Sequence, residues 1–136
     1  YGVKIDETSR YYQVHAAART AVPAEHLAFL NALPLQYETD DYIFVHAGIR
    51  PDVALAAQTE RDLLWIREPF LSHSAPREKM IIHGHTALEA PQLYSNRLNL
   101  DGGAGYGRPL TPVVIDNKQV FCLGAHGRVL LEQSAL

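Results

Sequence analysis

Two short apolar runs that each end on histidine and glycine constrain this chain more than any other feature. They occupy residues 43–48 and residues 80–86, and each is typical of a buried strand. The first ends at His46 before Ala47-Gly48, and the second ends in His83-Gly84-His85. In α/β proteins, ligands bind beyond the carboxyl ends of the strands. We therefore predict that imidazoles from both runs meet at one site.

The second run strengthens this prediction because it offers two histidines with a glycine between them. In extended backbone, residues two apart face the same side, so His83 and His85 are expected to face one pocket. Gly84 lets the backbone come close to whatever lies there. Neutral imidazole is a frequent ligand of Zn, Mn, Fe and Ni. We predict a metal site; for any single histidine, such as His46, the alternative is a core side chain held by a hydrogen bond.

Composition and length bound the class of protein. A chain of 136 residues fits one domain, and 47% hydrophobic with 20% charged residues is typical of a globular protein. The net charge of −3 and the absence of any basic run argue against a nucleic-acid surface. We see no signal peptide and no apolar stretch of membrane-spanning length, and Cys122 is the single cysteine. We expect a cytoplasmic protein with no membrane contact, in which Cys122 packs as a small core residue.

The order of local patterns predicts helices first and short strands later. Proline at 23 and 34 favours a helix between them, and Thr59 with Asp62 three places on resembles a capping box. These signals indicate a layered α/β sandwich that ends in meandering strands, with no domain boundary. The predicted helices cover residues 7–20, 24–33, 53–58 and 60–66. The predicted strands cover residues 35–39, 42–46, 80–82, 92–95, 97–101, 112–116, 119–123 and 127–132.

Other polar features allow two interpretations each. Arg67 is either the solvated end of an amphipathic helix that buries Trp65, or a planar fork for phosphate oxygens. Asp101 is a carboxylate at a strand end, and capping the glycine turn behind it is its favoured role. The glycine-rich residues 101–107 lack the pattern of a phosphate loop, so we expect a flexible turn that carries Tyr106 toward a cleft. We interpret the remaining histidines as surface or structural: His15, His26, His73 and His126.

Three motifs in order carry a resemblance to a known family. They are Val-His-Ala-Gly at 45–48, Trp-Ile-Arg at 65–67 and Gly-His-Thr at 84–86. Together they resemble the C-terminal half of the phosphoprotein phosphatase branch of the calcineurin-like metallophosphoesterases, which includes bacterial serine/threonine phosphatases and symmetrical diadenosine tetraphosphate hydrolases. The resemblance implies that residues 1–136 form the strand-rich C-terminal portion of one metallophosphoesterase domain, a layered sandwich in which helices flank mixed β-sheets.

The same resemblance assigns roles to individual residues. It implies that His46 and His85 bind the second of two divalent metal ions, Mn by preference with Fe, Zn or Ni as alternatives. His83 would lie behind these ligands without binding the metal. Arg67 would clamp the substrate phosphate, and Tyr106 would lie on the loop over the active site. Where relatives often have Asp-Thr-Gly-Ala, this chain has Asp-Gly-Gly-Ala at 101–104 and lacks the hydroxyl.

The chain lacks the motifs of the family's first half, which are Gly-Asp-x-His, Gly-Asp-x-x-Asp-Arg-Gly and Gly-Asn-His-Glu. In the family, these motifs supply the ligands of the first metal and the carboxylate that bridges the two metals. We expect the parent protein to hydrolyse phosphate monoesters, such as phosphoserine or phosphothreonine in proteins, by a hydroxide held between two metal ions, and this chain to be inactive by itself. Its expected partners are a phosphorylated substrate, the missing N-terminal half and a second copy of the chain. The alternatives are a symmetrical dinucleoside tetraphosphate hydrolase and a noncatalytic binding module on the same sheet.

Overall fold

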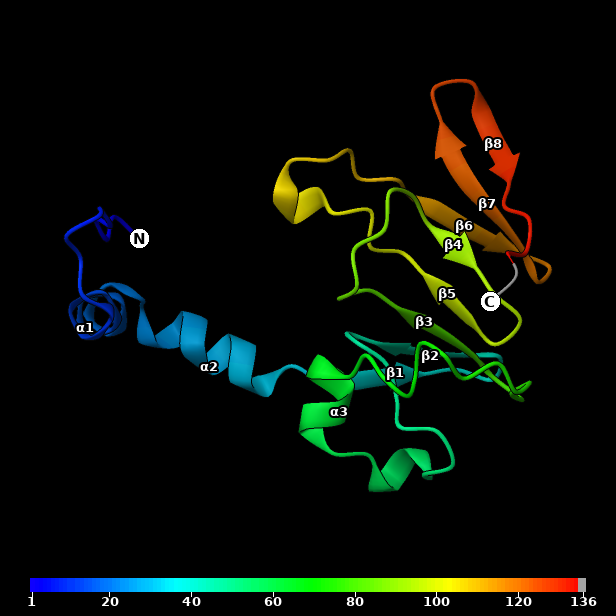
Figure 1. Ribbon diagram of the computed structural model, residues 1–136, viewed down its shortest axis with the longest axis horizontal. Coiled ribbons are helices and arrows are strands. Elements are labelled where there is room, and N and C mark those ends of the chain that lie inside the picture. Colours follow the sequence, from blue (N-terminus) through cyan, green and yellow to red (C-terminus); the bar gives the residue numbers. More distant parts are fainter. Residues whose placement is uncertain (135–136) are drawn as a thin grey trace. The chain divides into compact units, whose positions relative to one another are not determined.

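The computed structural model describes residues 1–134 and is a mixed α/β structure (Figure 1). Within these residues, three α-helices accompany two sheets. The chain divides into two compact units, Tyr1–Pro34 and Leu35–Leu136, and each is described by itself. Among the described residues, no helix combines the length and apolar character needed to cross a membrane.

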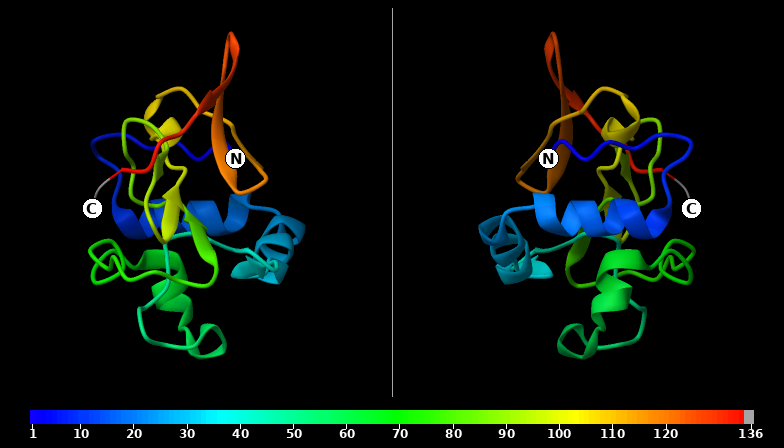
Figure 2. Two further views of the ribbon diagram at one scale, coloured as in Figure 1. Left: turned by 90° about the vertical axis from the view of Figure 1, so that its right-hand side faces the viewer. Right: turned by 90° about the vertical axis from the view of Figure 1, so that its left-hand side faces the viewer.

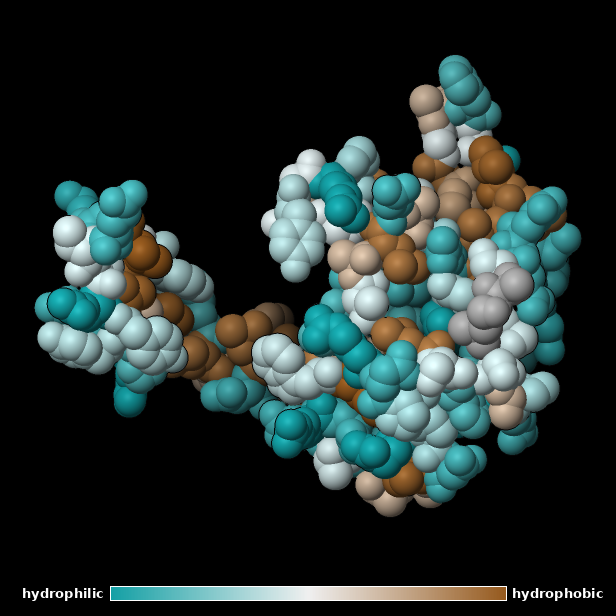
Figure 3. Space-filling model, viewed as in Figure 1, coloured by the Kyte–Doolittle hydropathy of each residue, from teal (hydrophilic) through white to brown (hydrophobic). Residues whose placement is uncertain are grey.

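The first unit consists of helix α1 (Tyr11–Ala21) and helix α2 (Ala24–Ala32). Helix α1 begins later than predicted because the Asp6 side chain accepts hydrogen bonds from the backbone and hydroxyl of Thr8, which stabilises a turn instead. Helix α2 starts directly after Pro23, as predicted. Neither helix contains a buried residue, and apolar side chains gather at the surface of this unit (Figure 3).

The second unit contains a five-stranded sheet in which parallel and antiparallel pairs mix. Its order is β1-β2-β3-β5-β4, with β3 in the centre. The β2–β3 and β3–β5 pairs are parallel, and the two outer pairs are antiparallel. The predicted hairpin between residues 35 and 46 is confirmed as β1 and β2. The strands are β1 (Gln36–Glu38), β2 (Tyr42–Val45), β3 (Met80–His83), β4 (Gln92–Leu93) and β5 (Arg97–Asn99).

A separate three-stranded sheet confirms the predicted meander. It comprises β6 (Val113–Asp116), β7 (Gln119–Gly124) and β8 (Gly127–Leu130), all antiparallel. The turn after Asp116 is made by Asn117 and Lys118, which both have positive φ, as a tight hairpin turn requires. The β7–β8 tip extends away from the sheets (Figure 2). Cys122 on β7 is only partly buried, and burial raises the pKa of its thiol.

Two apolar clusters cover opposite faces of the central strands. On β3, Ile81 belongs to the cluster formed with apolar residues between 43 and 70, and Ile82 belongs to the cluster formed with β5 and the second sheet. Because neighbouring residues of a strand face opposite sides, β3 is buried on both faces, as expected of a central parallel strand. The end of β3, where the histidines follow, is therefore rigidly held.

The connection from β2 to β3 carries the other candidate residues. It contains a 3₁₀ turn (η1, Leu55–Ala57), shorter than the predicted helix over 53–58, and helix α3 (Glu60–Trp65). The predicted cap is confirmed, because Thr59 Oγ1 accepts a hydrogen bond from the Asp62 backbone nitrogen. A second 3₁₀ turn, η2 (Ala104–Tyr106), lies in the glycine-rich segment.

Candidate functional site

The structure brings His46 and His85 together at one edge of the sheet. The parallel strands β2 and β3 end side by side; His46 follows β2 directly, and His85 lies two residues beyond β3. The Gly84 backbone nitrogen donates a hydrogen bond to the His46 carbonyl oxygen at 2.9 Å. The two ring centroids are 5.1 Å apart with an edge-to-face angle of 63°. Two histidines far apart in sequence thus form one pair, the His46–His85 pair.

The surroundings of the His85 imidazole leave one ring nitrogen without a partner among the described residues and disfavour the charged form. Its Nε2 is buried and has no hydrogen-bond partner among the described residues. Burial lowers the pKa of the His85 imidazole, and the charges of Arg67 and His46 lower it further, while Asp101 and the Trp65 backbone act in the opposite direction. These effects favour the neutral imidazole, which is the form that binds metals.

His83 is not part of this pair. Its side chain is 3% exposed, and its ring packs edge-on against Phe70 with centroids 4.9 Å apart. Burial lowers the pKa of His83 to about 4. His85 does not face the same side as His83, contrary to what the alternation of an extended strand predicted. The reason is that His85 has φ +65 and so leaves the extended backbone. His83 therefore belongs to the interior behind the strand end.

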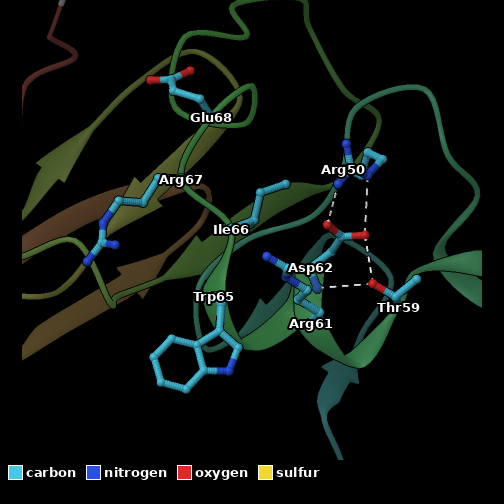
Figure 4. Close-up of a pocket in the computed structure, with 8 residues that line it drawn as sticks. All are labelled: Arg50, Thr59, Arg61, Asp62, Trp65, Ile66, Arg67 and Glu68. Carbon is cyan, nitrogen blue, oxygen red and sulfur yellow. Dashed lines mark hydrogen bonds and ion pairs between the residues drawn. The ribbon is translucent and has the colours of Figure 1, made fainter.

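Trp65 ends α3 and lies beside the pair, and Arg67 follows two residues later. The indole of Trp65 is perpendicular to the His85 ring, with centroids 5.7 Å apart. Trp65 is 66% exposed, so the alternative in which the helix buries its tryptophan is wrong; α3 buries Asp62 and Leu63 instead. The Arg67 guanidinium makes no hydrogen bond or ion pair within residues 1–134. In Figure 4 it projects to the same side as Trp65, away from Asp62.

A charged network that the sequence did not predict fixes this segment. Arg50 binds Asp62 through two hydrogen bonds, at 2.7 Å from Nη2 and 3.3 Å from Nε, and the Thr59 hydroxyl donates to the same carboxylate at 2.8 Å (Figure 4). Arg50 and then Thr59 lower the pKa of Asp62. The spacing of Thr59 and Asp62 predicted the cap, but no local signal joined Arg50 to it. Together with Arg61 and residues 65–68, these side chains line a shallow pocket.

The glycine-rich segment contributes less to the site. Asp101 Oδ1 accepts a hydrogen bond from the Gly103 backbone nitrogen at 2.9 Å, which confirms the predicted cap. Its charge still acts on His85. Tyr106 lies in η2 and is 83% exposed, and the structure records no contact between it and the His46–His85 pair.

The donor set is incomplete for a metal. Within residues 1–134, no group of three or more histidine, cysteine, aspartate or glutamate side chains is arranged to hold an ion. Protein zinc sites normally use three or four ligands. A metal ion bound by the His46–His85 pair would therefore need further ligands from elsewhere.

No family model, curated protein or solved structure matches this chain.

Proposed function

We propose that this chain supplies the second-metal half of a phosphatase of the calcineurin-like metallophosphoesterase type, with the layered half-domain fold that this family implies. His46 and His85 hold one divalent ion, and Arg67 binds the phosphate of the substrate. One observation carries the proposal: two imidazoles from separate strand ends lie in contact, and the buried Nε2 of His85 has no protein partner among the described residues. An imidazole left unpaired in this way suits a metal ligand.

Arg67 supports phosphate as the chemistry of the ligand. Its charge lowers the pKa of His85, so the guanidinium lies within electrostatic reach of the His85 imidazole. A planar guanidinium binds two phosphate oxygens at once, which gives orientation as well as attraction. A divalent ion held by the two histidines would act as a Lewis acid that offsets charge on the phosphoryl oxygens. His46, His85 and Arg67 together would orient a phosphate monoester at the sheet edge.

The remaining ligands are proposed to come from a separate stretch of polypeptide. Two-metal phosphatase sites need carboxylates that bridge the ions. The family pattern supplies them through Gly-Asp-x-His and related motifs, which this chain does not contain. We therefore expect this chain by itself to bind a metal weakly and not to turn over substrate. Manganese is the preferred ion, with iron, zinc and nickel as alternatives.

A second candidate function rests on a different surface. Tyr37 of β1 and Phe44 of β2 are both exposed, and their ring centroids lie 6.1 Å apart on one face of the sheet. Exposed aromatic side chains are enriched at protein interfaces. This face supports the alternative that the chain is a noncatalytic module that binds protein through its sheet.

The sole tryptophan provides a direct test of the metal proposal. Because Trp65 contacts His85, paramagnetic Co²⁺ held by the His46–His85 pair should quench the tryptophan emission. We expect saturable quenching that EDTA reverses, that His46→Ala and His85→Ala each abolish, and that His126→Ala leaves unchanged. Quenching that survives His85→Ala, or no quenching in the native chain, would contradict the proposal and favour the noncatalytic module.

A further inference from the structure

A hydrogen bond from a buried side-chain amide on the neighbouring strand β5 holds the turn that carries His85. Asn99 is the last residue of β5 and is 1% exposed. Its Nδ2 donates a hydrogen bond to the Thr86 carbonyl oxygen at 2.9 Å, and its Oδ1 accepts one from the Asp101 backbone nitrogen at 2.9 Å. Asn99 therefore joins the segment after β3 to the segment after β5.

The backbone of this turn is strained, so other contacts must hold it in place. His85 has φ +65, in the left-handed region that side chains other than glycine rarely adopt. Such a conformation is energetically unfavourable and persists only where the surrounding structure imposes it. The neighbouring restraints are backbone hydrogen bonds: Thr86 N to the Gly84 carbonyl at 2.7 Å, and Gly84 N to the His46 carbonyl at 2.9 Å.

Asn99 adds the side-chain restraint on the far side of His85. The side chains of His85 and Thr86 do not supply it, because His85 Nε2 and Thr86 Oγ1 are buried without a hydrogen-bond partner in the described part of the chain. The turn is thus held through its backbone oxygen at Thr86. We propose that Asn99 is a positioning residue that fixes the His85 ring against His46. Its consequence for metal binding rests on the proposed function, while its consequence for ring geometry does not.

A second buried amide provides a matched control. Asn96 is 4% exposed and immediately precedes β5. Its Nδ2 donates to the carbonyl oxygens of His73 at 2.7 Å and Ala75 at 3.1 Å, so it fastens a loop that lies outside the His46–His85 pair. Asn99→Asp and Asn96→Asp keep the side-chain shape and remove the amide donor. Asn99→Asp leaves one buried carbonyl oxygen unpaired and Asn96→Asp leaves two, so the control variant should lose at least as much stability.

The experiment measures ring geometry in the metal-free chain and affinity for Co²⁺. The native chain should show nuclear Overhauser contacts between the ring protons of His46 and His85. Asn99→Asp should lose these contacts and bind Co²⁺ about 10- to 100-fold more weakly, the range found when groups that orient metal ligands are removed. Asn96→Asp should keep both properties at native values.

The outcomes separate the two proposals. Retained ring contacts and native affinity in Asn99→Asp would overturn the positioning role, and so would an equal loss in Asn96→Asp, which would indicate general destabilisation. If the native chain binds no Co²⁺, the proposed function fails, yet the ring contacts still decide the role of Asn99. Should Asn99→Asp fail to fold, Asn99→Ser removes the same bond with a smaller polar group and is judged by the same two measurements.

Discussion

The two segments that bear candidate site residues are held in different ways. The His46–His85 pair follows two parallel strands that are paired in register and flanked by apolar clusters. The glycine-rich segment with Tyr106 follows β5 and is held by the Asp101 cap, by glycines with positive φ and by hydrogen bonds that join Asp101 and Arg108 to the backbone of Leu88. Parallel pairing fixes the two histidines against one another, whereas the bonds of the glycine-rich segment leave the Tyr106 side chain 83% exposed. The pair is therefore the stronger basis for a functional site.

The largest expected effect concerns the pair itself. In the longer protein that we propose supplies the carboxylates, His46→Ala and His85→Ala should each lower the proposed phosphatase activity by about 1,000-fold or more, because one metal would lose a ligand and its Lewis-acid contribution. Folding should change little. The measurement is p-nitrophenyl phosphate hydrolysis with Mn²⁺, with His126→Ala as the control. A near-normal rate in either variant would show that the ligand assignment is wrong.

The buried His83, behind the strand ends, should make the free energy of unfolding of the metal-free chain fall at low pH. Burial lowers the pKa of His83 from 6.5 to about 4, so the unfolded chain binds a proton that the folded chain does not. The stability contributed by neutral His83 is present above pH 6.5 and is lost as the pH falls toward 4, by up to about 3 kcal/mol. Urea unfolding in EDTA between pH 4 and 7 measures the loss. His83→Gln should flatten this slope, and an unchanged slope would refute the assignment.

Substitutions of Arg67 and Tyr106 test whether a side chain that acts on the His46–His85 pair affects catalysis more than one without contact to it. In the longer protein, Arg67→Ala should lower kcat/KM by about 100-fold, the loss found when a donor to developing charge is removed. Tyr106→Phe should change it by less than about 3-fold, because the side chain is exposed and makes no recorded contact with the pair. Steady-state kinetics on p-nitrophenyl phosphate distinguish the two. A larger loss for Tyr106→Phe would move the centre of the site to the glycine-rich loop.

The smallest expected effect is on the free energy of unfolding and concerns His85 and Gly103, which both have positive φ. His85→Gly should raise the free energy of unfolding by about 1 kcal/mol, because glycine adopts φ +65 without strain. Gly103→Ala should lower it by about 1 kcal/mol or more, since Gly103 has φ +79 and an added Cβ would lie 3.0 Å from Arg108 Cδ. Urea titrations measure both. A loss of stability in His85→Gly would indicate that the histidine conformation is not strained.

Local signals predicted much of the fold. Proline at 23 and 34 bounded α2, and Thr59 capped α3. Each of these depends on residues close in sequence. The start of α1 was missed because the Asp6 turn competes with the helix.

Features that depend on contacts between distant residues were not predictable in the same way. Two of these features join segments that no local pattern connects: the Arg50–Asp62 ion pair and the hydrogen bond from Asn99 to the Thr86 carbonyl oxygen. The third is the exposure of Trp65, which depends on how α3 is oriented against the sheet. The burial of His83 away from His85 follows from the φ of one residue, which the sequence does not reveal.

The sequence by itself determined which residues are eligible for chemistry, because apolar runs that end in histidine and glycine specify strand ends with imidazoles on them. Only the tertiary structure decided which imidazoles meet. Parallel pairing of β2 with β3 and the left-handed turn at His85 bring that ring to His46 and leave His83 in the core. The physical reason is that register and turn geometry are set by packing across the sheet, which involves residues distant in the chain.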